Sequence, residues 1–232
     1  MIRKFAAILL LAGIASIFMG LLFTYEPDAE LNTTARYYAE RTAADIGATN
    51  IVTAIVVTYR GLDTLGEVTV LFLTAAIVGL VLAHGRRRTS DKRRLAPVGE
   101  LLATGSRFLA PLIILLGVYV FANGHLTPGG GFQGGAIIAS GVLLILLADP
   151  CRCLSHRVID TVESVSGLFY VGIAILGIVL AGGFLDSHLL PRGELGALFS
   201  AGAIPLIYAL IGLKVGAEFS SILAHLSETE EL

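Results

Sequence analysis

Long apolar segments alternate with short polar stretches along the sequence. Apolar runs of about 20 residues with few charges are typical of helices that span a membrane. The strict alternation of apolar and polar residues that is typical of a membrane β-barrel is missing. We therefore predict an all-α, polytopic membrane protein of about six spanning helices. The predicted spans are 5–23, 64–83, 106–122, 134–148, 165–185 and 196–225.

The apolar stretch 46–83 is too long to be a single span. At about 1.5 Å per residue, one helix of this length would far exceed the hydrocarbon core, which is about 30 Å thick. The sequence Tyr59-Arg60-Gly61-Leu62-Asp63 interrupts it, and Gly61 relaxes the backbone there. Residues 64–67 (Thr-Leu-Gly-Glu) fit the capping box of a helix start. We expect a short helix at 46–59, then a break, then the second span.

Basic residues predict the orientation of the chain. The loop 84–97 reads HGRRRTSDKRRLAP, and loops rich in arginine and lysine face the cytoplasm. Arg3 and Lys4 precede the first span, so both termini are predicted to be cytoplasmic. Binding of anionic lipid is the alternative interpretation of the basic loop. The first span is longer than the apolar core of a signal peptide and has no A-x-A site after it, so we expect it to be retained.

The composition agrees with a membrane location and excludes several classes of function. Hydrophobic residues make up 55% of the chain and charged residues 15%, and the mean hydropathy is +0.83. A soluble domain carries roughly 25% charge, so the apolar excess must face lipid. No basic stripe indicates nucleic-acid binding. The pair Cys151 and Cys153 has only His156 nearby, which is too few ligands for a metal site.

Two parts of the sequence resemble membrane proteins of one kind of assembly. The stretch Gly124-His125-Leu126-Thr127-Pro128-Gly129-Gly130-Gly131-Phe132-Gln133-Gly134-Gly135 is similar to the signature of the MnhB family, which forms one subunit of Mrp-type antiporters. Further similarity to MnhB lies at 193–196, 204–208 and 211–216, so the resemblance covers about 100–225. The segments 50–55 and 60–67 resemble the C-terminal end of the large subunit of these antiporters. In membrane-bound hydrogenases and their sulfur-reducing relatives, that end is a separate small subunit.

The resemblance implies a chain of two parts, a two-helix segment at 1–95 and a four-helix MnhB-like domain at 96–232. It implies a multi-pass component, in the cell (inner, cytoplasmic) membrane, of an antiporter that is built of several subunits and exchanges Na+ or another monovalent cation for H+. The partners would be other Mrp subunits and membrane lipid. The alternative is the same module within a respiratory complex of the hydrogenase or sulfur-reductase type, and a third hypothesis is an assembly scaffold. No catalytic set or cofactor fingerprint is found, so we predict a non-enzymatic subunit without cofactor or metal.

Acidic residues stand near two predicted helix starts. Asp63 and Glu67 lie one turn apart, where the helix dipole favours negative charge. Capping alone would explain them, but a carboxylate inside a membrane is costly and usually functional, so Glu67 is also a candidate for a hydrated cation path. Arg60 is the expected ion-pair partner of Glu67. Asp160 and Glu163 are predicted to cap the fifth span.

The last predicted span carries Lys214 and Glu218 on one helix face, at the spacing i, i+4. Either the two side chains extend to the cytoplasmic interface, or they form a buried pair that relays protons or holds a cation. Gly212 and Gly216 form a small-residue face, which predicts close contact with another subunit. Pro205 is predicted to kink this helix near its centre.

The glycine-rich turn lacks the Gly-Lys-Ser/Thr ending of a phosphate-binding loop. We expect Pro128 to end one helix, and Gly129, Gly130 and Gly131 to let the next helix pack closely. His125 and Gln133 are candidate polar groups at a lumen or a partner contact. For His125, a structural hydrogen bond and a proton-relay role both remain open.

Overall fold

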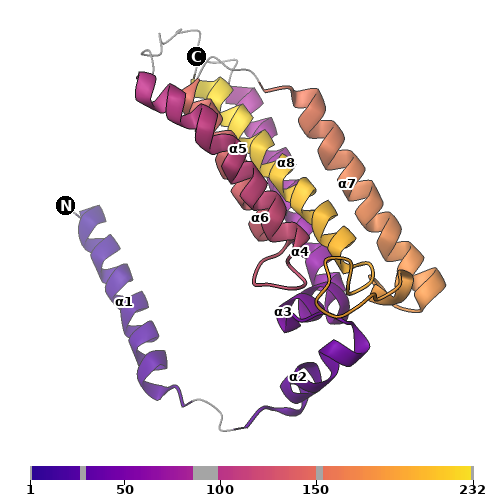
Figure 1. Ribbon diagram of the computed structural model, residues 1–232. Helices are drawn as coiled ribbons and strands as arrows, with labels where there is room; N and C mark the ends of the chain where they lie inside the picture. The colour runs from indigo at the N-terminus through magenta and orange to yellow at the C-terminus, as the bar shows by residue number, and fades with distance from the viewer. Residues whose placement is uncertain (1, 27–29, 86–98, 150–153, 231–232) are drawn as a thin grey trace. The chain divides into compact units, whose positions relative to one another are not determined.

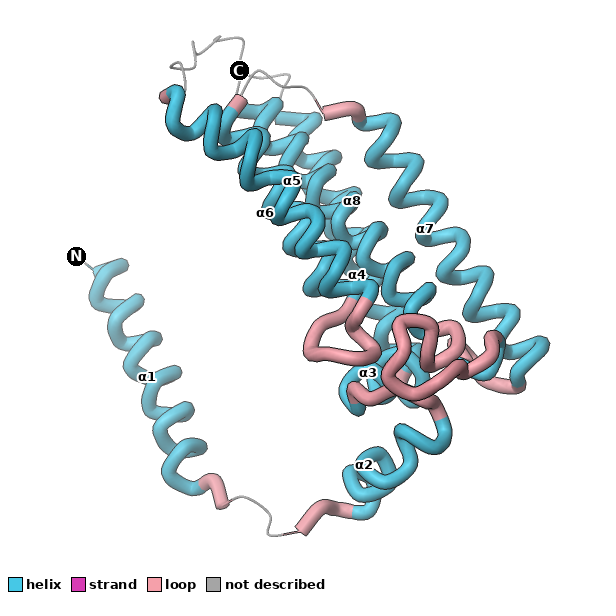
Figure 2. The backbone as a smooth tube through the Cα atoms, in the orientation of Figure 1, coloured by secondary structure: helices cyan, strands magenta, loops and turns pink. Residues whose placement is uncertain are grey.

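The six long apolar runs of the sequence all fold as helices. A computed structural model describes residues 2–26, 30–85, 99–149 and 154–230 (Figure 1). Within these ranges the chain is helical and has no strands, and six helices are long and apolar enough to cross a membrane (Figure 2). This confirms the all-α, six-span prediction. The spans are α1 (Ile2–Thr24), α4 (Gly61–Gly85), α5 (Glu100–Ala122), α6 (Gly131–Ala148), α7 (His156–Leu176) and α8 (Ile204–Glu230).

Two features used for the sequence predictions lie outside the described residues. These are the basic run at 86–94 and the cysteines at 151 and 153. The orientation of the chain therefore stays a prediction from the sequence.

The chain divides into two compact units, Met1–Tyr37 and Tyr38–Leu232. The first unit contains α1, and none of the α1 span is buried within the chain. A helix that is apolar all round needs an apolar environment. Its surface must therefore face lipid or other membrane chains. The helix α2 (Thr33–Asp45) begins in this unit, where Asn32 accepts a hydrogen bond of 2.8 Å from the backbone N–H of Ala35.

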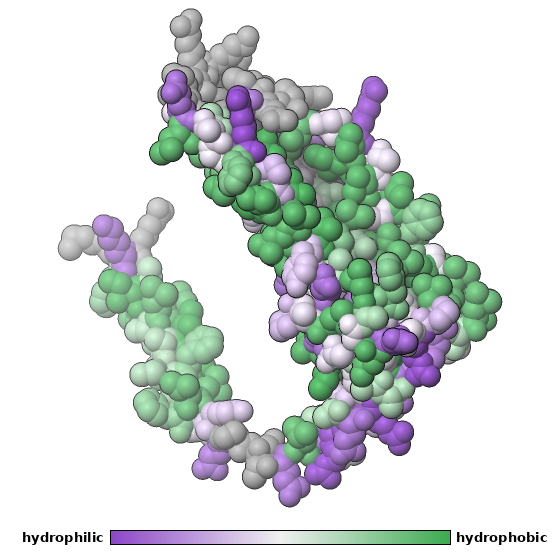
Figure 3. Space-filling model, viewed as in Figure 1, coloured by the Kyte–Doolittle hydropathy of each residue, from purple (hydrophilic) through white to green (hydrophobic). Residues whose placement is uncertain are grey.

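The second unit is a helical bundle in which α8 is the central helix. It packs against α4, α5, α6 and α7, and half of its span is buried (Figure 1). The core between these helices contains Tyr170, Ile207, Ile211 and Val215. Figure 3 shows that apolar side chains cover the visible helix surfaces, whereas polar side chains gather near helix ends. This distribution is that of a bundle surrounded by lipid or by other apolar helices.

Glycines allow the closest approaches in the bundle. A Cβ atom added to Gly135 of α6 would lie 2.8 Å from the carbonyl oxygen of Gly212 in α8. One added to Gly117 of α5 would lie 2.7 Å from the carbonyl oxygen of Gly134. Helices in membranes associate closely where small residues meet, so the expectation that the glycine-rich segment supports close packing is confirmed.

The small-residue face of α8 packs inside the chain. A Cβ atom on Gly212 would lie 2.4 Å from the ring of Phe121, and Gly216 faces Ile138. Both neighbours belong to this chain, on α5 and α6. The prediction that these glycines contact another subunit is therefore wrong for this face, because α5 and α6 already occupy it.

Two prolines have different positions from those predicted. Pro205 is the second residue of α8 and lies in its first turn, so it does not kink the helix centre. A proline is tolerated there because the first helical N–H groups have no partner within the helix. Pro128 does not end α5, since this helix ends at Ala122 and a turn precedes the proline.

The break before the second span is sharper than the sequence suggested. Asn50 caps α3 (Ile51–Ala54), which continues as a π-helix, η1 (Ile55–Tyr59). The helix α4 begins at Gly61, so Thr64 lies inside it and donates a hydrogen bond of 2.5 Å to the carbonyl of Val56. The predicted capping box of Thr64 and Glu67 is therefore wrong, because the helix starts three residues earlier.

Candidate functional site

The buried ion pair of Lys214 and Glu218 lies inside α8. The lysine Nζ is 2.8 Å from the glutamate Oε1, and the side chains are 11% and 0% exposed. Lys214 follows the helix start at Ile204 by only ten residues, which places it deep in the span. The interpretation that these side chains extend to the interface is therefore wrong, and the buried-pair interpretation agrees with the structure.

Three helices surround the lysine. The ring of Phe72 from α4 lies 4.8 Å from Nζ, a distance at which the negative face of an aromatic ring attracts a cation. On α7, a Cβ atom on Gly167 would lie 3.6 Å from Nζ, so this glycine leaves the space that the lysine occupies. A buried charge needs a partner and a suitable surrounding, and Lys214 has both.

Two buried polar atoms near this pair have no hydrogen-bond partner among the described residues. They are the second carboxylate oxygen of Glu218, Oε2, and the hydroxyl of Tyr170. An unpaired buried polar atom costs about 1–3 kcal/mol, and more when it is charged. A water molecule, a proton or a cation would therefore be stabilised at Glu218.

A second carboxylate approaches the pair from α7. Glu163 interacts electrostatically with both Lys214 and Glu218. The predicted capping role of Asp160 and Glu163 is wrong, because α7 starts at His156 after Ser155 and both residues lie beyond its first turn. Sequence reasoning missed this function of Glu163. Its spacing of four residues from Gly167 and seven from Tyr170 was the available signal, since such residues share a helix face.

The polar contacts continue on both sides of the pair. Glu67 of α4 is exposed within this chain and interacts electrostatically with Tyr170. In the other direction, the rings of His156 and His225 stack with their centroids 5.2 Å apart. We call the set Glu67, Tyr170, Lys214, Glu163, Glu218, His225 and His156 the polar row. It follows the α7–α8 interface, and α4 lies beside it at Phe72.

The predicted pairing of Arg60 with Glu67 is wrong. Arg60 instead bonds Asp63, with Nη2 2.5 Å and Nε 2.6 Å from Oδ2 of the carboxylate. Both side chains are exposed, and Asp63 lies in the first turn of α4. Asp63 thus has the position of a helix-start acid, as predicted. Glu67 is left without the expected counter-charge.

The other predicted polar groups lie at the turn between α5 and α6. His125 is fully buried, and its Nε2 lies 3.4 Å from the carbonyl oxygen of Ala197. A carbonyl only accepts, so Nε2 donates this hydrogen bond, and Nδ1 has no partner among the described residues. Burial lowers the pKa of His125 below its ordinary value. Gln133 is exposed at the start of α6.

The α3 segment holds this turn in place. The Asn50 amide donates hydrogen bonds of 2.8 Å and 3.0 Å to the carbonyls of Gly124 and Thr127. Thr53 donates to the same Gly124 carbonyl at 2.6 Å and accepts a hydrogen bond of 3.1 Å from Tyr208. Residues from the two halves of the sequence therefore form one hydrogen-bonded cluster.

Metal coordination finds no support in the geometry. Among the described residues, no group of three or more histidine, cysteine, aspartate or glutamate side chains is placed to hold a metal ion. The polar row therefore has the chemistry of proton and monovalent-cation handling, in which carboxylates, a lysine and histidines exchange partners.

Comparison with known families agrees with the resemblance seen in the sequence. Residues 101–221 match the family described as a domain related to the MnhB subunit of Na+/H+ antiporters. This chain belongs to that family. In addition, residues 3–96 of this MnhB-related chain match the MbhE family, which is described as a subunit of MBH. The polar row draws on both matched regions, because Glu67 lies in the first and Lys214 in the second.

Two solved structures resemble the MnhB-related chain over most of its length. A chain of the membrane-bound sulfane sulfur reductase, an archaeal respiratory membrane complex, is 39% identical with a TM-score of 0.80, over 97% of this chain and 98% of that one. A chain of the Mrp complex from Dietzia sp. DQ12-45-1b is 26% identical with a TM-score of 0.71, over 96% of this chain and 25% of that one.

A curated relative shows the same partial coverage. A probable K+/H+ antiporter subunit of Rhizobium meliloti is 27% identical over 240 residues, which is 90% of the MnhB-related chain and 23% of the relative. The chain thus spans about a quarter of the length of both antiporter matches. Together with the six apolar helices, these matches identify a multi-pass membrane protein.

Proposed function

We propose that this chain is a non-enzymatic membrane component of an antiporter that is built of several subunits and exchanges Na+ or another monovalent cation for H+. In this proposal the polar row forms part of the cation or proton path. The observation that carries it is the buried pair of Lys214 and Glu218, in which Oε2 has no hydrogen-bond partner among the described residues. Ionisable groups inside a membrane are costly and mark ion pathways.

The chemistry of the pair supports a relay. A proton or cation that reaches Glu218 reduces its negative charge and weakens its attraction for Lys214. The lysine, on a flexible stem, then turns toward Glu163, which already interacts with it electrostatically. Departure of the proton restores the original pair. One arrival therefore changes the partner of the lysine and moves charge along the row.

The path would need further subunits. Glu67 lies at one end of the row and is exposed within this chain, although it belongs to a membrane span. An exposed carboxylate at this depth requires a polar neighbour, which another membrane chain or a water-filled space would supply. We propose that the two-helix part at 1–95 supplies Glu67 and Phe72, and that the part at 96–232 supplies the remaining groups of the row.

A second candidate is the same module within a respiratory complex. The match to the sulfane sulfur reductase chain covers nearly the full length of both chains, whereas the Mrp match covers a quarter of its counterpart. In this case electron transfer in other subunits would drive the ion movement. Affinity purification of the assembled complex separates the two candidates, since co-purified chains with cysteine-ligated redox centres would identify the respiratory form.

Transport assays test the proposed path. In everted membrane vesicles that carry the whole complex, a pH-sensitive dye reports cation-driven proton release. We expect Lys214→Ala and Glu67→Gln each to reduce exchange at least about tenfold, the loss of one charge-assisted interaction. Glu194→Gln, in an exposed loop, is the matched control and should leave exchange unchanged. Normal exchange in both row variants, with normal assembly, would show that the chain is a scaffold.

A further inference from the structure

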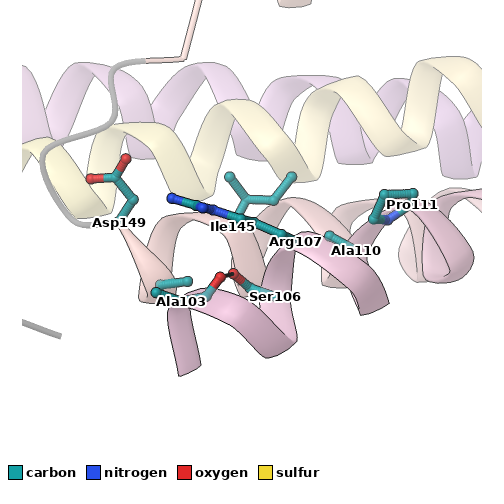
Figure 4. Close-up of a pocket in the computed structure, with 8 residues that line it drawn as sticks. Ala103, Ser106, Arg107, Ala110, Pro111, Ile145 and Asp149 are labelled. Atoms are coloured by element: carbon teal, nitrogen blue, oxygen red, sulfur yellow. Dashed lines mark hydrogen bonds between the residues drawn. The ribbon is translucent and has the colours of Figure 1, made fainter. Parts of the chain in front are cut away.

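A pocket of about 380 Å³ lies between α5 and α6, at the end of the hairpin far from the glycine-rich turn. Figure 4 shows Arg107 of α5 extending toward Asp149, the residue that follows α6. The recess exists because the side chains between the helices are small. Its lining residues are Ala103, Ser106, Arg107, Ala110, Pro111, Ile145, Ala148 and Asp149.

The two charges of this pocket are opposite and yet not paired with each other. No ion pair within 4.0 Å joins Arg107 to Asp149, and among the described residues neither side chain has another ion-pair partner. Both side chains are exposed to the pocket opening. A ligand that carries one charge of each sign would satisfy both groups at once.

The backbone supplies a third polar group. Pro111 has no N–H, so the carbonyl of Arg107, four residues earlier in α5, lacks its helical hydrogen-bond donor. The hydroxyl of Ser106 donates to the carbonyl of Ala103 at 3.0 Å and so does not replace that donor. The pocket therefore combines a guanidinium, a carboxylate and a free carbonyl oxygen.

We propose that this pocket binds the headgroup of a membrane phospholipid that carries both a phosphate and a primary ammonium group, as phosphatidylethanolamine does. The Arg107 guanidinium has the fork geometry that binds a phosphate through two hydrogen bonds. The ammonium would donate to Asp149 and to the Arg107 carbonyl. Charge complementarity thus favours this headgroup over anionic lipid, which Asp149 would repel.

The position of the pocket fits a lipid. Asp149 directly follows the last residue of α6, and Arg107 lies seven residues inside α5, so the pocket is at one end of the spanning hairpin. Headgroups lie at this height. Leu102 and Leu147, beside the lining residues Ala103 and Ala148, are exposed and give acyl chains an apolar surface. This inference does not depend on the proposed ion path.

Native mass spectrometry of the full chain tests the proposal. The delipidated chain is offered phosphatidylethanolamine, phosphatidylcholine and phosphatidylglycerol with identical acyl chains. We expect one bound phosphatidylethanolamine, retained about tenfold better than the other two lipids, since each lacks an ammonium that can donate hydrogen bonds. Arg107→Gln and Asp149→Asn should each weaken this binding about tenfold. Arg157→Gln, an exposed arginine on α7, is the control and should not.

A third variant tests the recess independently of charge. Ala103→Leu fills the lining of the pocket and should also weaken retention of phosphatidylethanolamine. Equal retention of all three lipids, or unchanged binding in the Arg107 and Asp149 variants, would overturn the proposal. So would a photo-crosslinking residue at position 103 that captures a protein partner instead of a lipid in the assembled complex.

Discussion

The Nζ atom of Lys214 lies between a carboxylate on its own helix and the face of an aromatic ring on another. Glu218 is 2.8 Å away, and the centroid of the Phe72 ring is 4.8 Å away. The lysine belongs to the region that matches the MnhB-related family, whereas the phenylalanine belongs to the region that matches the MbhE family. The buried charge is therefore stabilised by both parts of the chain at once.

Removal of the aromatic face should destabilise the second unit. We expect Phe72→Leu to lower the free energy of unfolding by about 1–2 kcal/mol, because a desolvated cation–π contact contributes about that much. Phe72→Tyr keeps the face and should retain most of the stability. Phe108→Leu, on the exposed face of α5, is the matched control and should change stability little. Thermal unfolding of the purified chain in detergent measures all three, and equal effects at positions 72 and 108 would contradict the contact.

The ion pair itself should show strong coupling between its members. Lys214→Met or Glu218→Leu alone leaves a buried, unpaired charge, and we expect each to destabilise the chain by about 3–5 kcal/mol. The double variant removes both charges and should be more stable than either single variant. A double-mutant cycle on unfolding free energies gives the coupling directly. If the two single effects simply add, the pair is not the source of the stabilisation.

The apolar pattern predicts the helices well but their ends poorly. The last span was expected to begin at residue 196, whereas α8 begins at Ile204. The intervening residues include Leu198, Phe199 and Ala203, which have the hydropathy of a helix. They form a loop because Gly193, Gly196 and Gly202 adopt positive φ angles, which hydropathy does not record.

This error at the helix end changed the interpretation of the site. With a helix that begins at 196, Lys214 falls near the far end of the span, where a lysine extends to the interface. With the observed start it lies in the interior. The i, i+4 spacing of Lys214 and Glu218 was visible in the sequence, since it is local. The contribution of Glu163 was not, because it depends on how α7 packs against α8.

The glycines between α6 and α8 give a test of the packing. Gly135→Ala would place a Cβ atom 2.8 Å from both the carbonyl oxygen of Gly212 and the Cβ atom of Val215, and neither can move aside easily. We expect a loss of about 1–3 kcal/mol in unfolding free energy, as for other overpacked cores. A Cβ atom on Gly172 of α7 meets nothing within 4 Å. Gly172→Ala should therefore be neutral or stabilising, by up to about 1 kcal/mol from helix propensity.

The same thermal-unfolding measurement on both alanine variants decides the point. Two equal shifts would mean that helix propensity alone determines the outcome. In that case the α6–α8 contact at Gly135 would be looser than its geometry indicates.

Stability should also depend on pH through His125. Burial lowers the pKa of the folded-state imidazole, while the unfolded chain keeps a value near 6.5. Between these two values the unfolded state binds more protons than the folded state, so the unfolding free energy falls as the pH falls. The stabilisation is fully present above about pH 6.5 and is lost toward the folded-state pKa. Unfolding measured from about pH 8 to about pH 5 should show this decline.

A glutamine at position 125 separates this titration from the other acid effects. His125→Gln keeps an amide donor near the position of Nε2, which donates to the Ala197 carbonyl, but has no group that titrates in this range. We expect the variant to match the wild type at about pH 8 and to lose less stability than the wild type at about pH 5. The remaining decline belongs to the carboxylates. An identical pH dependence in the two proteins would mean that the imidazole becomes charged as easily in the folded chain as in the unfolded one, which its full burial and partnerless Nδ1 argue against.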